Sequence, residues 1–115
     1  MTKPRQRWRP ISLMPAFKFA IGSAAETAHT QAENMRLAID QPDLIDRMEL
    51  TRMRLVYEDT AQQVDMCREQ LKRWCGECTT PEQVKALERL AGIVKQWADD
   101  TRLVRDAIDT LLHEG

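Results

Sequence analysis

The stretch LTRMRLVYEDTAQQVDMCREQLKRW, residues 50–74, decides the fold. Apolar or small residues recur in it at alternating steps of three and four. The recurring residues are Leu50, Met53, Tyr57, Thr60, Val64, Cys67, Leu71 and Trp74. A period of about 3.5 residues puts all of these side chains on one stripe of an α-helix. Because such a stripe must be covered by another element, the stretch predicts a long helix inside a helical bundle.

Two further stretches show the same repeat, one on each side of residues 50–74. The first contains Met14, Phe17, Ile21, Ala24, Ala28, Gln31, Met35 and Ala38. The last contains Leu87, Leu90, Val94, Trp97, Thr101, Val104, Ile108 and Leu111. The sequence contains no run of alternating apolar and polar residues of the kind that indicates a β-strand. The sequence therefore predicts an all-α fold, an antiparallel up-down-up three-helix bundle with long coiled-coil-like helices.

Turn and capping residues predict where the three helices begin and end. Thr80-Pro81-Glu82-Gln83 has the pattern of a capping box with proline at the first helical position. Gly76 can adopt the left-handed conformation that closes a helix, and Pro42 marks the other turn. We expect helices at about 15–40, 43–75 and 81–113, with an extended arm at 1–11 and the bundle at 12–115.

The N-terminal arm differs from the rest of the chain in charge. Its first ten residues have four basic and no acidic side chains, whereas the remainder has 13 basic and 18 acidic ones. The residues that could hold phosphates or stack on a base are Lys3, Arg5, Arg7, Trp8 and Arg9. Binding of nucleic acid through this arm is therefore one alternative function, and a solvated basic tail is the other interpretation.

Hydropathy and cysteine content bear on the compartment. No run of about 18 apolar residues exists, so we expect no transmembrane helix. The apolar stretch 11–21 resembles the core of a secretory signal, but Pro15 and Lys18 interrupt it. Three cysteines, an odd number without a disulfide framework, favour a reducing cytoplasm. We therefore expect a cytoplasmic protein.

The sharpest local motif is Trp74-Cys75-Gly76-Glu77-Cys78, which resembles the W-C-G-P-C site of thioredoxins. The resemblance covers five residues and departs at Glu77, where that family has proline. A reactive first cysteine needs the positive end of a helix, whereas Cys75 is predicted to lie at a helix C-terminus. We therefore expect no thioredoxin-like enzyme, and a reversible redox or metal switch at Cys75 and Cys78 stays as a second alternative.

Other constellations of polar residues do not predict a catalytic or metal site. Two cysteines supply half of the ligands that a structural zinc ion needs. Glu26 and His29 have the spacing of a di-iron motif, but such sites need two copies. We expect no catalytic residues, no metal and no cofactor, and therefore not an enzyme.

The second predicted helix has more apolar residues than one stripe uses. The surplus consists of Leu44, Ile45, Met48, Leu55 and Val56. A wide apolar arc is covered on more than one side, and exposed methionine and leucine suit an adaptable protein contact. The sequence therefore predicts a non-enzymatic module for protein–protein association, an adaptor, scaffold or oligomerisation unit, with homodimerisation or binding of another protein expected through these residues.

Overall fold

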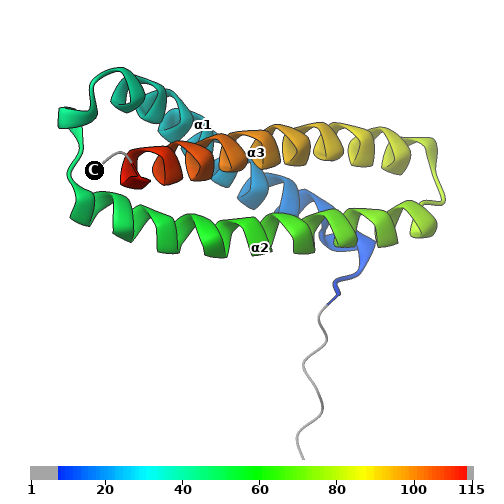
Figure 1. Ribbon diagram of the computed structural model, residues 1–115. Coiled ribbons are helices and arrows are strands. Elements are labelled where there is room, and N and C mark those ends of the chain that lie inside the picture. The colour runs from blue at the N-terminus through cyan, green and yellow to red at the C-terminus, as the bar shows by residue number, and fades with distance from the viewer. Residues whose placement is uncertain (1–7, 114–115) are drawn as a thin grey trace, which may run out of the picture.

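The computed structural model describes residues 8–113 of the chain. They form three long helices and two short 3-10 turns. In chain order these are the turn Ile11–Leu13, α1 (Met14–Asp40), the turn Pro42–Leu44, α2 (Arg47–Glu77) and α3 (Pro81–His113). Figure 1 shows α2 antiparallel to α3 and α1 running in the same general direction as α3. The predicted up-down-up three-helix bundle is confirmed.

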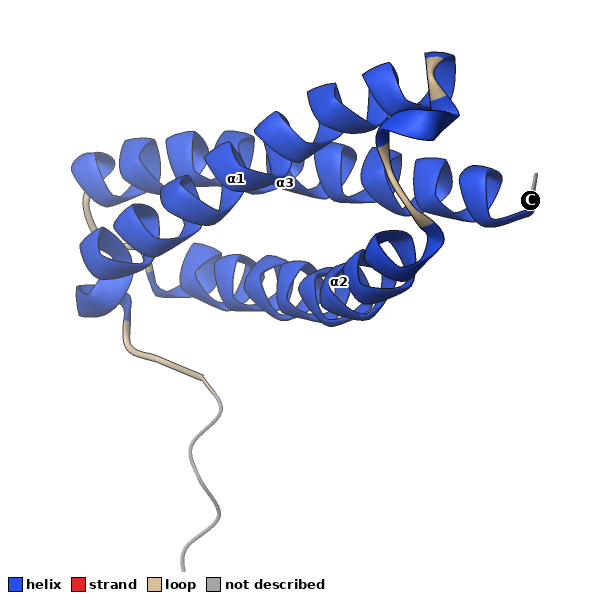
Figure 2. Cartoon of the chain, turned by 90° about the vertical axis from the view of Figure 1, so that its left-hand side faces the viewer, coloured by secondary structure: helices blue, strands red, loops and turns tan. Residues whose placement is uncertain are grey.

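The last helix, α3, is the centre of the bundle. Both α1 and α2 pack along α3, whereas the backbones of α1 and α2 rarely approach each other. Leu90, Val104 and Ile108 of α3 are completely buried between the other two helices. In Figures 1 and 2, α1 crosses the other helices diagonally and diverges from α2 toward the connection at 41–46. The two outer helices are therefore close only where α1 begins and α2 ends.

Small side chains let α1 lie against α3. The buried stripe of α1 is rich in alanine, and Ala28 and Ala32 are almost inaccessible to solvent. Short side chains on one helix reduce the distance at which a second helix can pack. The large residues of the contact, such as Trp97, come from α3. Gln31, which the repeat placed on the core stripe of α1, lies only partly buried at its edge.

The capping box at the start of α3 forms as its residues predict. The backbone N–H of Gln83 donates to the Thr80 hydroxyl over 3.1 Å, and the Gln83 side chain accepts from the Thr80 N–H over 3.3 Å. Pro81 is the first helical residue and needs no hydrogen-bond acceptor there. All the groups in this motif lie within four residues of one another, which is why sequence alone locates it.

The boundaries of α2 differ from the expected 43–75. Pro42–Leu44 forms a separate 3-10 turn, and Asp46 caps the helix by accepting the Glu49 N–H over 2.7 Å. At the other end, no described residue has a positive φ, and Gly76 continues the helix. The helix ends at Glu77 because Cys78 is extended, with φ −64° and ψ 130°. The expectation that Gly76 closes the helix is therefore wrong.

The first helix starts without a side-chain cap. Met14 rather than Pro15 is its first residue, and Leu13 occupies the N-cap position with no side-chain hydrogen bond. Ser12, the nearest residue with a capping hydroxyl, lies in the preceding 3-10 turn. Within 8–113, no helix is long and apolar enough to cross a membrane.

Candidate functional site

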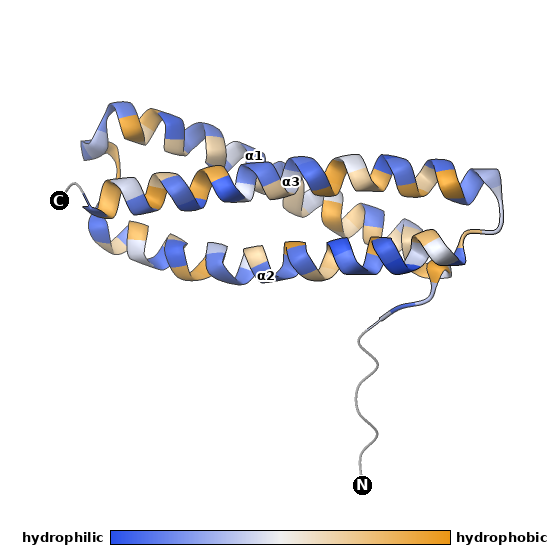
Figure 3. Cartoon of the chain, turned by 45° about the vertical axis from the view of Figure 1, so that its right-hand side comes forward, coloured by the Kyte–Doolittle hydropathy of each residue, from blue (hydrophilic) through white to orange (hydrophobic). Residues whose placement is uncertain are grey.

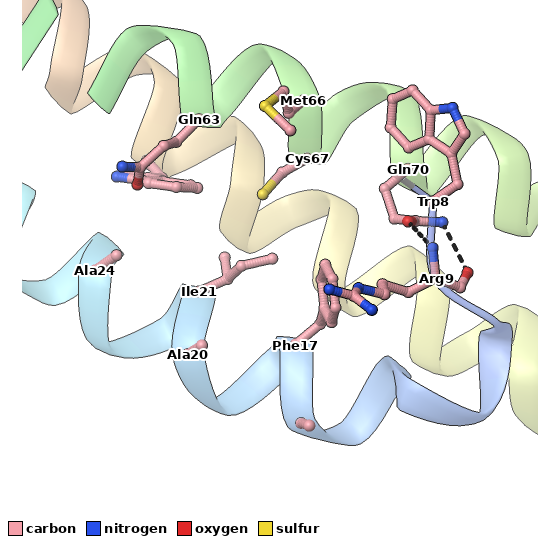
Figure 4. A pocket seen from close by; sticks show the side chains of 12 residues that line it. Trp8, Arg9, Phe17, Ala20, Ile21, Ala24, Gln63, Met66, Cys67 and Gln70 are labelled. Carbon is pink, nitrogen blue, oxygen red and sulfur yellow. Dashed lines mark hydrogen bonds between the residues drawn. The ribbon is translucent and has the colours of Figure 1, made fainter. Parts of the chain in front are cut away.

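The end of the basic arm is attached to α2 through the backbone of Arg9. The Gln70 side chain accepts the Arg9 N–H over 2.8 Å and donates to the Arg9 carbonyl over 3.2 Å. The indole N–H of Trp74 donates to the same carbonyl over 2.9 Å. Figure 4 shows Gln70 facing the Arg9 backbone, with dashed lines for its two bonds. Gln70 is buried. Its side-chain amide would destabilise the fold if it had no hydrogen-bond partner, and these bonds supply the partners.

The other residues predicted to contact nucleic acid divide into two groups. Lys3, Arg5 and Arg7 lie outside the described residues. Trp8 is partly buried, and the Arg73 guanidinium lies 4.3 Å from the centroid of its ring. This cation–π contact covers one face of the indole, the surface that a base would need for stacking.

A groove runs from Arg9 along the space between α1 and α2 (Figure 4). Its volume is about 570 Å³, within the range typical of small-molecule sites. Phe17 and Ile21 line it from α1, Met66 and Cys67 line it from α2, and Trp97 of α3 also lines it. Phe17 is further fixed by an edge-to-face contact with Trp74, with ring centroids 5.0 Å apart.

The groove stays open because α1 presents alanines toward α2. Ala16, Ala20 and Ala24 recur at steps of four and lie on one side of the helix. Their methyl groups are too short to reach α2 across the space. Larger residues there would close the gap between the two outer helices.

The three cysteines are free thiols in different surroundings. Cys67 is partly buried in the groove, and this burial raises the pKa of its thiol above the ordinary value. Cys75 is exposed in the last turn of α2, and Cys78 is partly buried directly after it. The structure therefore leaves the predicted Cys75 and Cys78 switch as an untested prediction.

A polar cluster lies in the middle of the bundle around the buried carboxylate of Asp100. Its Oδ2 accepts from Gln96 Nε2 over 3.0 Å and lies 3.1 Å from His29 Nδ1. The other ring nitrogen of His29 is 3.3 Å from Glu33. His29 therefore joins α1 to α3 through Asp100 and also contacts Glu33 on its own helix.

Tyr57 on α2 lies opposite this cluster, and the pKa of its phenol is shifted. Burial raises the pKa of Tyr57 above its ordinary value, and the negative charge of Asp100 raises it further. The folded protein therefore holds this proton more tightly than the unfolded chain does. Stability from this source is complete below about pH 10 and is lost as the pH rises through the raised pKa.

Replacing Tyr57 with phenylalanine should reduce the alkaline loss of stability. The contribution of one proton is at most about 1.4 kcal/mol per pH unit. We expect the unfolding free energy from urea titrations to fall less between about pH 9 and about pH 11 in Tyr57→Phe than in wild type. Equal losses in the two proteins would contradict this assignment.

The apolar residues predicted as a partner surface are mostly exposed on the finished fold. Leu44, Met48, Leu55 and Val56 keep between 58% and 71% of their surface in solvent. Ile45 is partly buried against the core and is the exception. Figure 3 shows hydrophobic segments recurring along α2 between hydrophilic ones. The bundle thus leaves these four side chains without cover from the rest of 8–113.

Comparison of the chain with protein-family models, curated proteins and solved structures finds no significant match. Among the described residues, no group of three or more histidine, cysteine, aspartate or glutamate side chains gathers where a metal ion could bind. The exposed apolar residues of α2 and the groove beside Arg9 are two surfaces that the described fold leaves open.

Sequence reasoning missed Gln70 and Asp100. Both are buried polar residues on helices whose apolar stripes were correctly located. Each lies one position before a residue of its stripe, Leu71 or Thr101. That adjacency is a weak signal, because the partners come from distant segments, Arg9 for Gln70 and His29 for Asp100.

Proposed function

We propose that this chain is a non-enzymatic protein-association module that forms a homodimer through the outward face of α2. The observation that supports the proposal is the exposure of Leu44, Met48, Leu55 and Val56 within one short segment. Single exposed apolar residues are common, but a group of large ones indicates an interaction surface. A reducing cytoplasm, in which the free thiols persist, is the compartment we expect for it.

The spacing on this face fits pairing of α2 with a second α2. A second heptad-like series runs along the outward side of α2, through Met48, Arg52, Leu55, Asp59, Gln62 and Met66. Apolar residues at steps of three and four form the seam of a helix pair. The exposed residues of this series can pack against the same residues of a second copy of the chain.

The charges on the seam favour antiparallel pairing. With a twofold axis between Leu55 and Val56, Arg52 of one copy lies opposite Asp59 of the other, and the contact occurs twice. Parallel pairing would place Arg52 against Arg52, which like-charge repulsion disfavours. Within the chain, Arg52 contacts only an exposed Glu49 over 3.7 Å among described residues, so its side chain can exchange partners.

Charge reversal across the axis tests this arrangement. Arg52→Asp alone and Asp59→Arg alone should each weaken the dimer about tenfold, because each creates two like-charge contacts. The double variant Arg52→Asp/Asp59→Arg should restore affinity, since opposite charges again face each other. Sedimentation equilibrium measures the dissociation constant for each protein.

Arg54 and Glu58 supply the matched control. They form an exposed ion pair over 3.5 Å on the same helix, and both lie away from the seam. Arg54→Asp should leave the dissociation constant within about twofold. Equal weakening by Arg54→Asp, or a double variant that stays weak, would show that this face does not pair in the proposed register.

A further inference from the structure

Among residues 8–113, one charged side chain lines the groove between α1 and α2, and it is a cation. The lining consists of aromatic, aliphatic and sulfur-containing side chains with two glutamines, and no aspartate or glutamate contributes to it. Within this described lining, Arg9 supplies the positive charge. No carboxylate in residues 8–113 forms an ion pair with the Arg9 guanidinium. An apolar site with one unpaired cation suits a ligand that is apolar along its length and anionic at one end.

The position of Arg9 is set before any ligand binds. Its N–H and its carbonyl are both held, by Gln70 and Trp74, so that its backbone is fixed beside the groove. In Figure 4 its side chain extends from the arm toward Phe17 and Ile21. A group that is already positioned loses less entropy on binding than a free arm would.

We propose that the groove binds the aliphatic chain of a fatty acid, with the carboxylate at the Arg9 guanidinium. The chain lies against Phe17, Ile21 and Met66 and ends near Trp97. Burying this hydrocarbon provides most of the affinity, because apolar surface of both the ligand and the groove is removed from water. The guanidinium provides the preference for an acid over an alcohol of the same length.

Cys67 reports on the occupant because its thiol lines the groove, whereas Cys75 is exposed outside it. Decanoate, added to the full chain below its micelle concentration, should slow the alkylation of Cys67 by iodoacetamide at least about fivefold. The alkylation of Cys75 in the same sample should not change. Peptide mass spectrometry follows both sites, and unprotected Cys67 would overturn the proposal.

The role of the charge is tested by comparing decanoate with decanol in calorimetric titrations. Wild type should bind decanoate about fivefold more tightly, the size expected for an exposed ion pair. Arg9→Gln should remove this difference by weakening decanoate alone, since the side chain is exposed and its backbone bonds remain. Lys18→Gln, which removes a cation outside the groove, should leave the difference intact.

The place of the hydrocarbon is tested by filling the groove. Ala20→Trp adds a large side chain at an exposed position that lines it, and both ligands should bind at least about tenfold more weakly. Ala91→Trp on the exposed side of α3 is the matched control and should bind both as wild type does. Equal affinity of wild type for decanoate and decanol, or unchanged binding in Ala20→Trp, would overturn the proposal.

Discussion

Trp74→Ala should lower the free energy of unfolding by about 3–5 kcal/mol, the usual cost of truncating a buried aromatic side chain. Trp74 is completely buried, and its ring makes an edge-to-face contact with the ring of Phe17. Truncation leaves a cavity where α1 and α2 are closest. It also removes the indole donor to the Arg9 carbonyl, so that among the described residues only the Gln70 side chain still hydrogen-bonds the Arg9 backbone. Urea titration at a fixed protein concentration measures the change.

Trp74→Phe separates packing from hydrogen bonding at this position. Phenylalanine keeps most of the ring volume but has no N–H, so we expect a smaller loss of about 1–2 kcal/mol. Limited proteolysis should then cut the arm before Arg9 faster than in wild type. A Trp74→Ala protein within about 1 kcal/mol of wild type would show that this contact does not join the arm to the bundle.

The architecture could be predicted because each helix has its own repeating stripe. Every stripe residue of α3, from Leu87 to Leu111, is buried in the structure. The start of α3 was predictable for a similar reason, since Thr80 and Gln83 interact within one turn. Period and capping depend on neighbours in sequence, and sequence reasoning captures them.

The boundaries of α2 depended on a choice among local alternatives. Asp43 and Asp46 are both acceptable near a helix start, and Asp46 becomes the cap because Pro42–Leu44 forms a separate turn. Gly76 can close a helix but also tolerates helical geometry, and here it stays helical. Helix propensity permits either aspartate as the cap and either conformation at Gly76, so it could not predict which one forms.

The groove and the polar contacts could not be predicted because they depend on how α1 crosses α3. The repeat places Ala20 beside the core stripe of α1, but it does not say that α2 is too distant for that side chain to reach. Gln70 meets Arg9 across 61 residues of sequence, and His29 meets Asp100 across 71. Such pairs follow from the crossing geometry of the helices, which stripes alone leave open.

The apolar surplus on α2 was predictable as a surface for a related reason. Leu55 lies off the core stripe by sequence spacing, and it remains exposed because it is on the side of α2 that faces away from the bundle. The spacing of apolar residues shows which side chains are not buried in the core of the bundle. The identity of the covering partner depends on a second molecule, and the antiparallel register of Arg52 and Asp59 is our proposal for it.

Replacing Met48 and Leu55 together with aspartate should dissociate the dimer. The pair would place four carboxylates near the centre of the seam, where each would lose water without gaining a partner. Both positions are largely exposed in the single chain, at 71% and 65%, so the fold itself should be unaffected. We expect the dissociation constant to rise at least about a hundredfold.

Val84→Asp is the matched control for this double variant. Val84 is another exposed apolar residue, 43% accessible, but it lies near the start of α3 and outside the seam. A new charge there changes solubility and helix propensity in a comparable way. It should leave the dissociation constant unchanged.

Sedimentation velocity of wild type, Met48→Asp/Leu55→Asp and Val84→Asp tests the central claim most directly. We predict a species of twice the chain mass for wild type and Val84→Asp, and a single chain with unchanged circular dichroism for the double variant. A wild-type protein that sediments as one chain at all concentrations, or a double variant that stays dimeric, would contradict association through this face of α2.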